Sequence, residues 1–351
     1  MSTPYNPNFF MTDYRKITEE SSRYDRLEEK SPEVILREMS EENLIPAQAV
    51  AQALPQITRL VERILPRLEQ GGRIFYIGAG TSGRLGVLDA SEIPPTFGMP
   101  EDLFIGLIAG GDQALRHPVE NAEDVTEQAL KDLSPFHPNS ADTLIGITAA
   151  GSTPYVLHGI IAARRLGLLT GCITSNPGSP VTQAAHVSVV TVVGPEYVTG
   201  SSRLKSGTAQ KMVLNMISTA LMIKMGRVKG NKMVDMQLSN HKLIERGTRI
   251  IMQETGVSTQ LARETLLRLR SVRRAIQALQ QTQLDPHLSK IRSAPNDLFI
   301  RTKSDARPQG AKLSPSRPTF CPASALRLTG PARASERIWP WGKRGPFETV
   351  A

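Results

Sequence analysis

The sequence is poor in cysteine and in aromatic residues, and it has no long apolar run. Cys172 and Cys321 cannot build a disulfide framework and do not have metal-ligand spacing. Aromatic residues make up only 5%, and no basic surface motif contains them, which argues against nucleic-acid binding. No stretch approaches the roughly 20 apolar residues of a membrane span, and the N-terminus shows no secretory signal. We therefore expect a cytoplasmic protein with no metal, membrane or nucleic-acid partner.

Positive charge is concentrated at one end of the chain. The formal net charge is +9, but most of the excess lies after residue 296, so the body is close to neutral. From residue 295 onward the composition turns to scattered proline, arginine and serine without periodicity. This composition is typical of a solvated segment, and we expect residues 295–351 to form a disordered, basic, proline-rich tail.

Short apolar strands alternate with helical patterns through the middle of the chain. Alternation of this kind predicts an α/β fold in which a parallel sheet is covered by helices on both faces. Residues 240–290 have only helical patterns and predict a small helical domain. The expected domains are an N-terminal extension at 1–45, a sheet domain at 46–238 and a helical domain at 239–294. The expected strands are 73–77, 103–109, 143–149, 170–175 and 187–193, and the expected helices include 31–40, 46–68, 119–133 and 155–166, with a long helix ending at 225.

The most informative stretch is residues 73–98, RIFYIGAGTSGRLGVLDASEIPPTFG. A strand, a loop rich in Gly, Thr and Ser, and a helix start together form an anion site, because free backbone N–H groups and the helix dipole favour a phosphate. Thr81, Ser82 and Arg84 add donors. The loop also fits G-x-G-x-x-G, but the acidic pair at 101–102 precedes the next apolar run, whereas a dinucleotide fold needs it afterwards. A tight turn without any ligand is the other alternative.

Three such loops each follow an expected strand and open an expected helix. Ligands of parallel sheets bind at the carboxyl ends of strands, which is where these loops fall. A single Ser/Thr loop is usually a helix cap, but three at one edge favour binding of a sugar phosphate. The candidate binding residues are Gly80, Thr81, Ser82 and Arg84 in the first loop, Ser152 and Thr153 in the second, and Ser201, Ser202, Arg203 and Lys205 in the third.

Two acidic residues stand out as candidates for acid–base chemistry. Glu92 precedes a proline pair near the first loop, and Glu123 lies in HPVENAED, three residues after Glu120, on one face of an expected helix. Acidic residues in a first helical turn usually complement the dipole, and spacing alone does not exclude that role here. His117, directly before a proline, fits a turn residue better than a base or ligand.

Several segments together carry a family resemblance. YIGAGTSGRLGVLDASEIPPTFG, HPVENAED, VGPEYVTGSSRLKSGTAQKMVLNM and KGNKMVDMQLSN resemble the N-acetylmuramic acid 6-phosphate etherase family, which has the sugar isomerase (SIS) fold and is akin to the glucokinase regulatory protein. The resemblance covers about residues 14 to 280. It implies a three-layer SIS sandwich, a small C-terminal helical domain, and a homodimer with active sites at the subunit junction.

The resemblance also implies a reaction, with no cofactor. The family is a carbon–oxygen lyase that converts N-acetylmuramic acid 6-phosphate into N-acetylglucosamine 6-phosphate and D-lactate during peptidoglycan recycling. Its catalytic glutamates fall on Glu92 and Glu123. One carboxylate can remove the C2 proton of the open-chain sugar, and a protonated carboxyl can assist the departure of lactate. We assign Glu123 to the C2 proton and Glu92 to the leaving group and the incoming water, although the pattern does not fix which is acid and which is base.

The second loop departs from the family pattern. Where the family usually has Ala-Ser-Gly-Arg-Thr, this chain has Ala149, Ala150, Gly151, Ser152 and Thr153. A serine hydroxyl and an arginine are missing, which predicts weaker substrate binding. Ser206 replaces the commoner alanine, and the chain after residue 294 does not resemble the family. A sugar-phosphate-binding regulator and an aldose–ketose isomerase on the same fold are the alternative functions.

Overall fold

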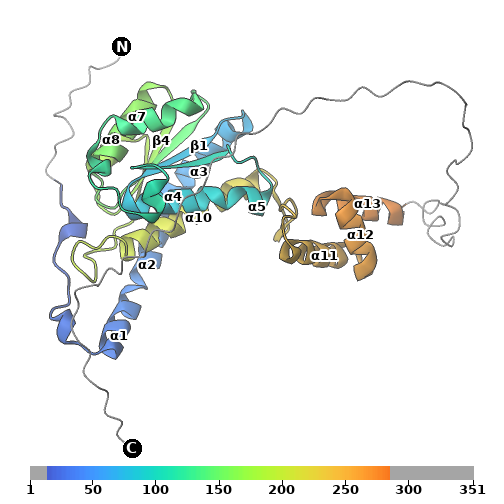
Figure 1. Ribbon diagram of the computed structural model, residues 1–351, viewed down its shortest axis with the longest axis horizontal. Helices are drawn as coiled ribbons and strands as arrows, with labels where there is room; N and C mark the ends of the chain where they lie inside the picture. Colours follow the sequence, from blue (N-terminus) through green and yellow to red (C-terminus); the bar gives the residue numbers. More distant parts are fainter. Residues whose placement is uncertain (1–13, 285–351) are drawn as a thin grey trace, which may run out of the picture. The chain divides into compact units, whose positions relative to one another are not determined.

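A five-stranded parallel sheet forms the centre of the protein (Figure 1). The computed structural model describes residues 14–284. The strand order is β2-β1-β3-β4-β5, and every neighbouring pair is parallel. All five expected strands are present, which confirms the α/β class. Their bounds are β1 Ile74–Gly78, β2 Phe104–Ile108, β3 Thr143–Ile147, β4 Leu169–Thr174 and β5 Val187–Val190.

Helices cover both faces of the sheet and make three layers. Successive residues of a strand point to opposite faces, so Ile74 and Tyr76 lie in one apolar core while Phe75 and Ile77 lie in the other. The first core packs against α2 (Ile45–Gln52), α3 (Leu54–Glu69), α4 (Gly80–Ser91) and α10 (Lys205–Lys224). The second packs against α7 (Gln128–Leu133), α8 (Pro154–Arg165) and α9 (Pro180–Ala184).

The N-terminal segment consists of the turns η2 (Ile17–Glu19) and η3 (Leu27–Glu29) and of helix α1 (Pro32–Glu42). Its first part is hydrogen-bonded to loops at the carboxyl edge of the sheet, through Tyr14 to the Ala150 carbonyl and through Ser22 to the Tyr197 carbonyl. The next expected helix, 46–68, is two helices that meet at Ala53. Pro55 lies in the first turn of α3, where its missing N–H is not needed, whereas inside a continuous helix it would lose a bond.

The expected helix at 119–133 is wrong over its first half. Residues 117–121 form a loop, η4 (Ala122–Asp124) is a single turn, and only α7 is helical. Asn121 has a φ of 59°, a left-handed conformation that an α-helix does not contain. Glu120 and Glu123 therefore do not share a helix face. Three further short elements are α5 (Ile93–Phe97), α6 (Gln113–Arg116) and η5 (Ser134–Phe136).

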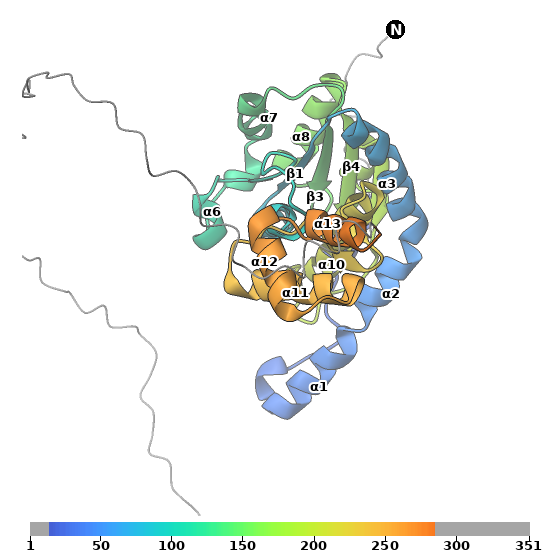
Figure 2. The same ribbon diagram turned by 90° about the vertical axis from the view of Figure 1, so that its right-hand side faces the viewer.

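Residues after α10 form a small ribbon and three helices with a core of their own (Figure 2). The ribbon pairs β6 (Val228–Lys229) with β7 (Lys232–Met233), and the helices are α11 (His241–Thr255), α12 (Thr259–Leu269) and α13 (Val272–Leu284). Asn240 and Ser258 cap α11 and α12. The expected helical segment is confirmed as far as residue 284, while the expected tail at 295–351 lies outside the described residues.

Candidate active site

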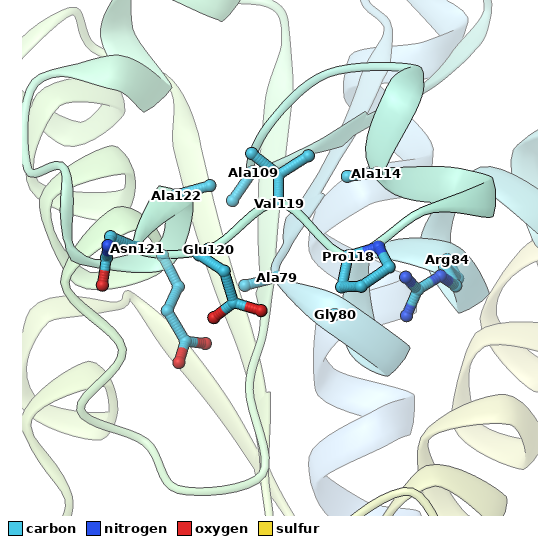
Figure 3. A pocket seen from close by; sticks show the side chains of 11 residues that line it. Ala79, Gly80, Arg84, Ala109, Ala114, Pro118, Val119, Glu120, Asn121 and Ala122 are labelled. Carbon is cyan, nitrogen blue, oxygen red and sulfur yellow. The ribbon is translucent and has the colours of Figure 1, made fainter. Parts of the chain in front are cut away.

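A cavity of about 220 Å³ lies at the carboxyl ends of β1 and β2 (Figure 3). In a parallel sheet of order 2-1-3-4-5, ligands bind at this edge, near the point where the strand order reverses beside β1. Arg84 and Glu120 reach the cavity from opposite sides of Gly80 (Figure 3). The cavity is lined by Ala79, Gly80, Arg84, Ala109, Ala114, Pro118, Val119, Glu120, Asn121, Ala122 and Glu123.

The N-terminus of α4 opens toward this cavity. The residue before the helix is Ala79, which has no side chain that can cap it, and the first backbone bond of the helix runs from Gly83 N to Ala79 O. The N–H groups of the first turn have no acceptor within the helix, and they carry the positive end of its dipole. The guanidinium of Arg84 is held in place by the Leu115 carbonyl at 3.1 Å. Backbone donors and a cation thus face one space, which suits a phosphate.

The N-terminus of α10 is closed by a carboxylate of the protein itself. Buried Glu196 accepts hydrogen bonds from the backbone N–H groups of Lys205 and Ser206, at 2.9 and 3.0 Å, and from the Ser206 hydroxyl at 2.8 Å. The ammonium group of Lys205 pairs with buried Glu42. Lys205, expected to bind substrate, is therefore engaged inside the protein and does not line the cavity.

The first and third loops meet beside α4. A Cβ placed on Gly207 would lie 3.3 Å from the methyl group of Thr81, so the two helix starts are in close contact. Next to this contact, the Ser82 hydroxyl donates a hydrogen bond to Gln210 Oε1 at 2.9 Å. The structure brings Thr81 and Ser82 to the start of α10. Arg203 is exposed, and Ser201 and Ser202 are half-buried.

Polar side chains form hydrogen bonds that hold the second loop in place. The amide nitrogen of Asn176 donates to the carbonyls of Ala149 and Ala150, at 3.2 and 3.1 Å, and also to the Thr18 hydroxyl. The hydroxyls of Thr148 and Thr153 are 2.8 Å apart and hydrogen-bonded. Ser152 is half-buried, and its loop contributes no cation.

The two candidate glutamates lie in different places. Glu123 is exposed and lines the cavity. Glu92, also exposed, follows the last residue of α4, and this helix of 12 residues is about 18 Å long. Within one chain the structure therefore brings Glu123 to the first loop but holds Glu92 about one helix length away from it.

The turn of α4 before Glu92 is anchored by Asp89. This buried carboxylate accepts hydrogen bonds from Asn215, at 2.7 Å, and from Ser218 and Tyr76, each at 3.2 Å. Burial raises the pKa of Asp89 above the ordinary carboxyl value, and the three donors partly offset that effect. The anchor ties the end of α4 to α10 and to β1.

Sequence reasoning missed several residues of this region. Asn121 and the alanines of the cavity wall have no chemical signature, although an asparagine between a proline turn and an acidic run is a signal for a left-handed residue. Asn176, Glu196 and Gln210 act through contacts between distant parts of the chain, which no local pattern reveals. Among residues 14–284 there is no cluster of His, Cys, Asp or Glu that could hold a metal ion. The same range contains no helix long and apolar enough to cross a membrane.

Two family models match the chain. The N-terminal SIS domain of the glucokinase regulatory protein matches residues 56–163, and the C-terminal lid domain of the same protein matches residues 230–297. The first match covers β1, the first loop and the cavity, and it agrees with the parallel sheet described above.

Curated relatives match over most of their own length. An N-acetylmuramic acid 6-phosphate etherase of Porphyromonas gingivalis is 62% identical over 268 residues, which cover 76% of this chain and 98% of the relative. The protein of the same name from Bacteroides thetaiotaomicron is 60% identical over 266 residues, covering 76% and 96%. Among solved structures, a phosphoheptose isomerase from Francisella tularensis is 16% identical, with a TM-score of 0.42 and coverage of 56% of this chain and 100% of that one.

Proposed function

The chain belongs to the N-acetylmuramic acid 6-phosphate etherase family, enzymes that cleave a carbon–oxygen bond, and we propose that it acts on that substrate. The products are N-acetylglucosamine 6-phosphate and D-lactate, formed in the cytoplasm during recycling of cell-wall amino sugars. The observation that carries the proposal is the uncapped N-terminus of α4 beside Arg84 and Glu123, in a chain 62% identical to a named etherase.

The phosphate binds at the start of α4. The free N–H groups of its first turn and the Arg84 guanidinium supply donors, and the helix dipole adds attraction. Thr81, Ser82, Ser152, Thr153, Ser201, Ser202 and Arg203 remain candidate contacts for the phosphate and the sugar hydroxyls. Lys205 does not contact the phosphate in this proposal, because its ammonium group is paired with Glu42; it contributes by holding the start of α10 in place.

The reaction is an elimination followed by addition of water. Glu123 removes the C2 proton, which is acidic because it lies next to the aldehyde of the open-chain sugar. The C3–O bond breaks, and Glu92 donates a proton to the departing lactate oxygen. Water then adds at C3 and gives one proton to Glu92, while Glu123 returns its proton to C2. The net change is hydrolysis of the ether, and both carboxyl groups return to their starting states.

Glu92 comes from a second copy of the chain. A phosphosugar bound at the start of α4 cannot also reach a carboxyl group about 18 Å away at the end of the same helix. We therefore place the active site at the junction of a homodimer, where Glu92 of one chain meets Glu123 of the other. The exposure of both side chains in the single chain is consistent with this arrangement.

Release of D-lactate from N-acetylmuramic acid 6-phosphate tests the proposal directly. The wild-type chain should release D-lactate, and Glu92→Gln and Glu123→Gln should each slow release by about 10²-fold or more while the proteins remain folded. A folded wild-type protein that yields no lactate would reject the etherase function. Binding of the phosphosugar without turnover would favour a regulator, to which the match with the glucokinase regulatory protein models also points. Interconversion of aldose and ketose phosphates would favour an isomerase.

Mixing the two inactive variants tests the shared site. If each site takes Glu92 from one chain and Glu123 from the other, a dimer of Glu92→Gln with Glu123→Gln has one intact site. Random exchange in an equal mixture then restores about one quarter of wild-type activity. A mixture that exchanges subunits and stays inactive would place both glutamates of a site in the same chain.

A further inference from the structure

Gln210 is a fully buried glutamine whose amide nitrogen has no hydrogen-bond partner among the described residues. Its oxygen accepts the Ser82 hydroxyl at 2.9 Å, so only half of the amide is satisfied. Buried amides normally have both ends paired, because an unpaired buried donor costs free energy. An orphan donor next to a binding loop suggests that its partner appears only when a ligand binds.

Gln210 lies directly behind the open end of α4. It is in the second turn of α10, next to the place where Gly207 contacts Thr81. Ser82, its partner, is the third residue of α4 and belongs to the turn whose N–H groups face the cavity. The N-terminus of α10 is already satisfied by Glu196, so Gln210 has no role in capping that helix.

We propose that Gln210 is a positioning residue that turns the Ser82 hydroxyl toward the substrate phosphate, an inference that rests on the proposed function. In the free protein the one hydroxyl proton of Ser82 is given to Gln210 Oε1, so Ser82 has no proton to offer an anion. A half-turn of the amide exchanges its oxygen and nitrogen at little steric cost. Gln210 Nε2 then donates to Ser82 Oγ, and Ser82 donates to the phosphate.

This rearrangement gives Gln210 Nε2 an acceptor and adds one hydrogen bond from Ser82 to the phosphate. Hydrogen bonds to charged acceptors are stronger than neutral ones, and a chain of donors strengthens each member. A passive role is the alternative, in which the Ser82–Gln210 bond only holds α4 against α10. Two variants are needed to distinguish the two roles. Gln210→Glu keeps an acceptor for Ser82 but has no amide donor, and Gln210→Met removes the donor without placing a negative charge near the phosphate.

The test is calorimetric titration of the full chain with N-acetylglucosamine 6-phosphate, together with KM and kcat for lactate release. Gln210→Met, which is close in shape and has no donor, and Gln210→Glu should each weaken binding by about tenfold or more. KM should rise in proportion, with kcat within about twofold of wild type. Ser82→Ala should weaken binding similarly, and adding Gln210→Met to it should have little further effect.

Thr170→Val is the matched control, because it removes another hydrogen bond of a fully buried side chain, the bond between Thr170 and the partly buried His186 near the amino end of β4. It should leave binding of the phosphosugar unchanged, and thermal melting checks that each variant is folded. If wild type binds the phosphosugar and Gln210→Glu binds it equally well, Gln210 only holds α4 against α10 and the inference is overturned. If wild type neither binds the phosphosugar nor releases lactate, the proposed function fails and the inference falls with it.

Discussion

The ammonium group of Lys205 pairs with the carboxylate of Glu42 in the interior, where the two side chains are only 1% and 7% exposed. Glu42 ends helix α1 and also accepts a hydrogen bond from Tyr24 at 3.3 Å. The pair therefore fastens the N-terminal segment to the start of α10. Lys205, which we expected from the sequence to bind substrate, is part of the buried contact between α1 and α10.

Glu42→Ala should destabilise the protein by about 3–5 kcal/mol, because it leaves the Lys205 charge buried without a partner. Chemical denaturation measures the loss. Removing both charges, in Glu42→Leu with Lys205→Met, should recover much of it. The control is Glu33→Ala in the same helix, since Glu33 is exposed and 4.0 Å from Arg37. A loss for Glu42→Ala no larger than for Glu33→Ala would show that the buried pair does not matter for stability.

Glu123→Gln should lower kcat for D-lactate release by about 10²- to 10⁴-fold, the usual contribution of a general base. Glu120→Gln, at the same cavity, should have a smaller effect, because Glu120 is assigned no proton transfer. Glu127→Gln is the control, since this glutamate is exposed and does not line the cavity. If Glu120→Gln lowered kcat more than Glu123→Gln did, Glu120 would be the base.

Asp89 should make the stability of the wild type fall as pH rises above the ordinary carboxyl range of about 4. Burial raises its pKa in the folded state, so the folded protein holds this proton more tightly than the unfolded chain does. By linkage, the contribution of Asp89 to stability is then greatest at low pH and decreases through the interval between its unfolded and folded pKa values. Asp89→Asn removes this dependence.

The measurement is the unfolding free energy of wild type and of Asp89→Asn from pH 4 to pH 8. The difference between them should shift in favour of the variant as pH rises. A difference that shifts toward wild type would mean that the three hydrogen bonds from Tyr76, Asn215 and Ser218 outweigh burial and lower this pKa.

Ser152→Arg should lower KM for the phosphosugar by about tenfold, because it restores a cation to the second loop and adds a charged hydrogen bond. Ser152 is half-buried in a loop held by Asn176, so an arginine here would be carried on fixed backbone. Ser152→Gln, which has a polar side chain but no charge, serves as the control. An equal KM for both variants would show that charge at this position does not contribute to binding.

The sheet and the first loop were predictable because their signals are local. Alternating strands and helices fix a parallel sheet, and a Gly, Thr and Ser loop after β1 marks the open helix end. All five strands and the helical segment after residue 240 are where the sequence indicates. Even here the start of α4 came earlier than expected, since Gly80 to Ser82 are already helical.

The features that the sequence did not predict depend on contacts between residues far apart in the chain. The helix expected from residue 119 is interrupted at Asn121, because one left-handed residue outweighs the helix propensity of its neighbours. Likewise, no local pattern shows that Lys205 turns inward to Glu42, since the two are 163 positions apart. The catalytic roles of Glu92 and Glu123 and the domain boundaries stay predictions.

Helix α4 is one uninterrupted helix that begins at the cavity and ends next to Glu92. Its two ends cannot move independently, so an axial displacement at Gly80 is passed unchanged to Glu92. In a dimer that shares its sites, a ligand that pulls on the start of the helix in one pocket would shift the acid that serves the other. In such a dimer, the hydrogen bonds of Asp89 to Tyr76, Asn215 and Ser218 would oppose that movement and so limit any coupling between the two pockets.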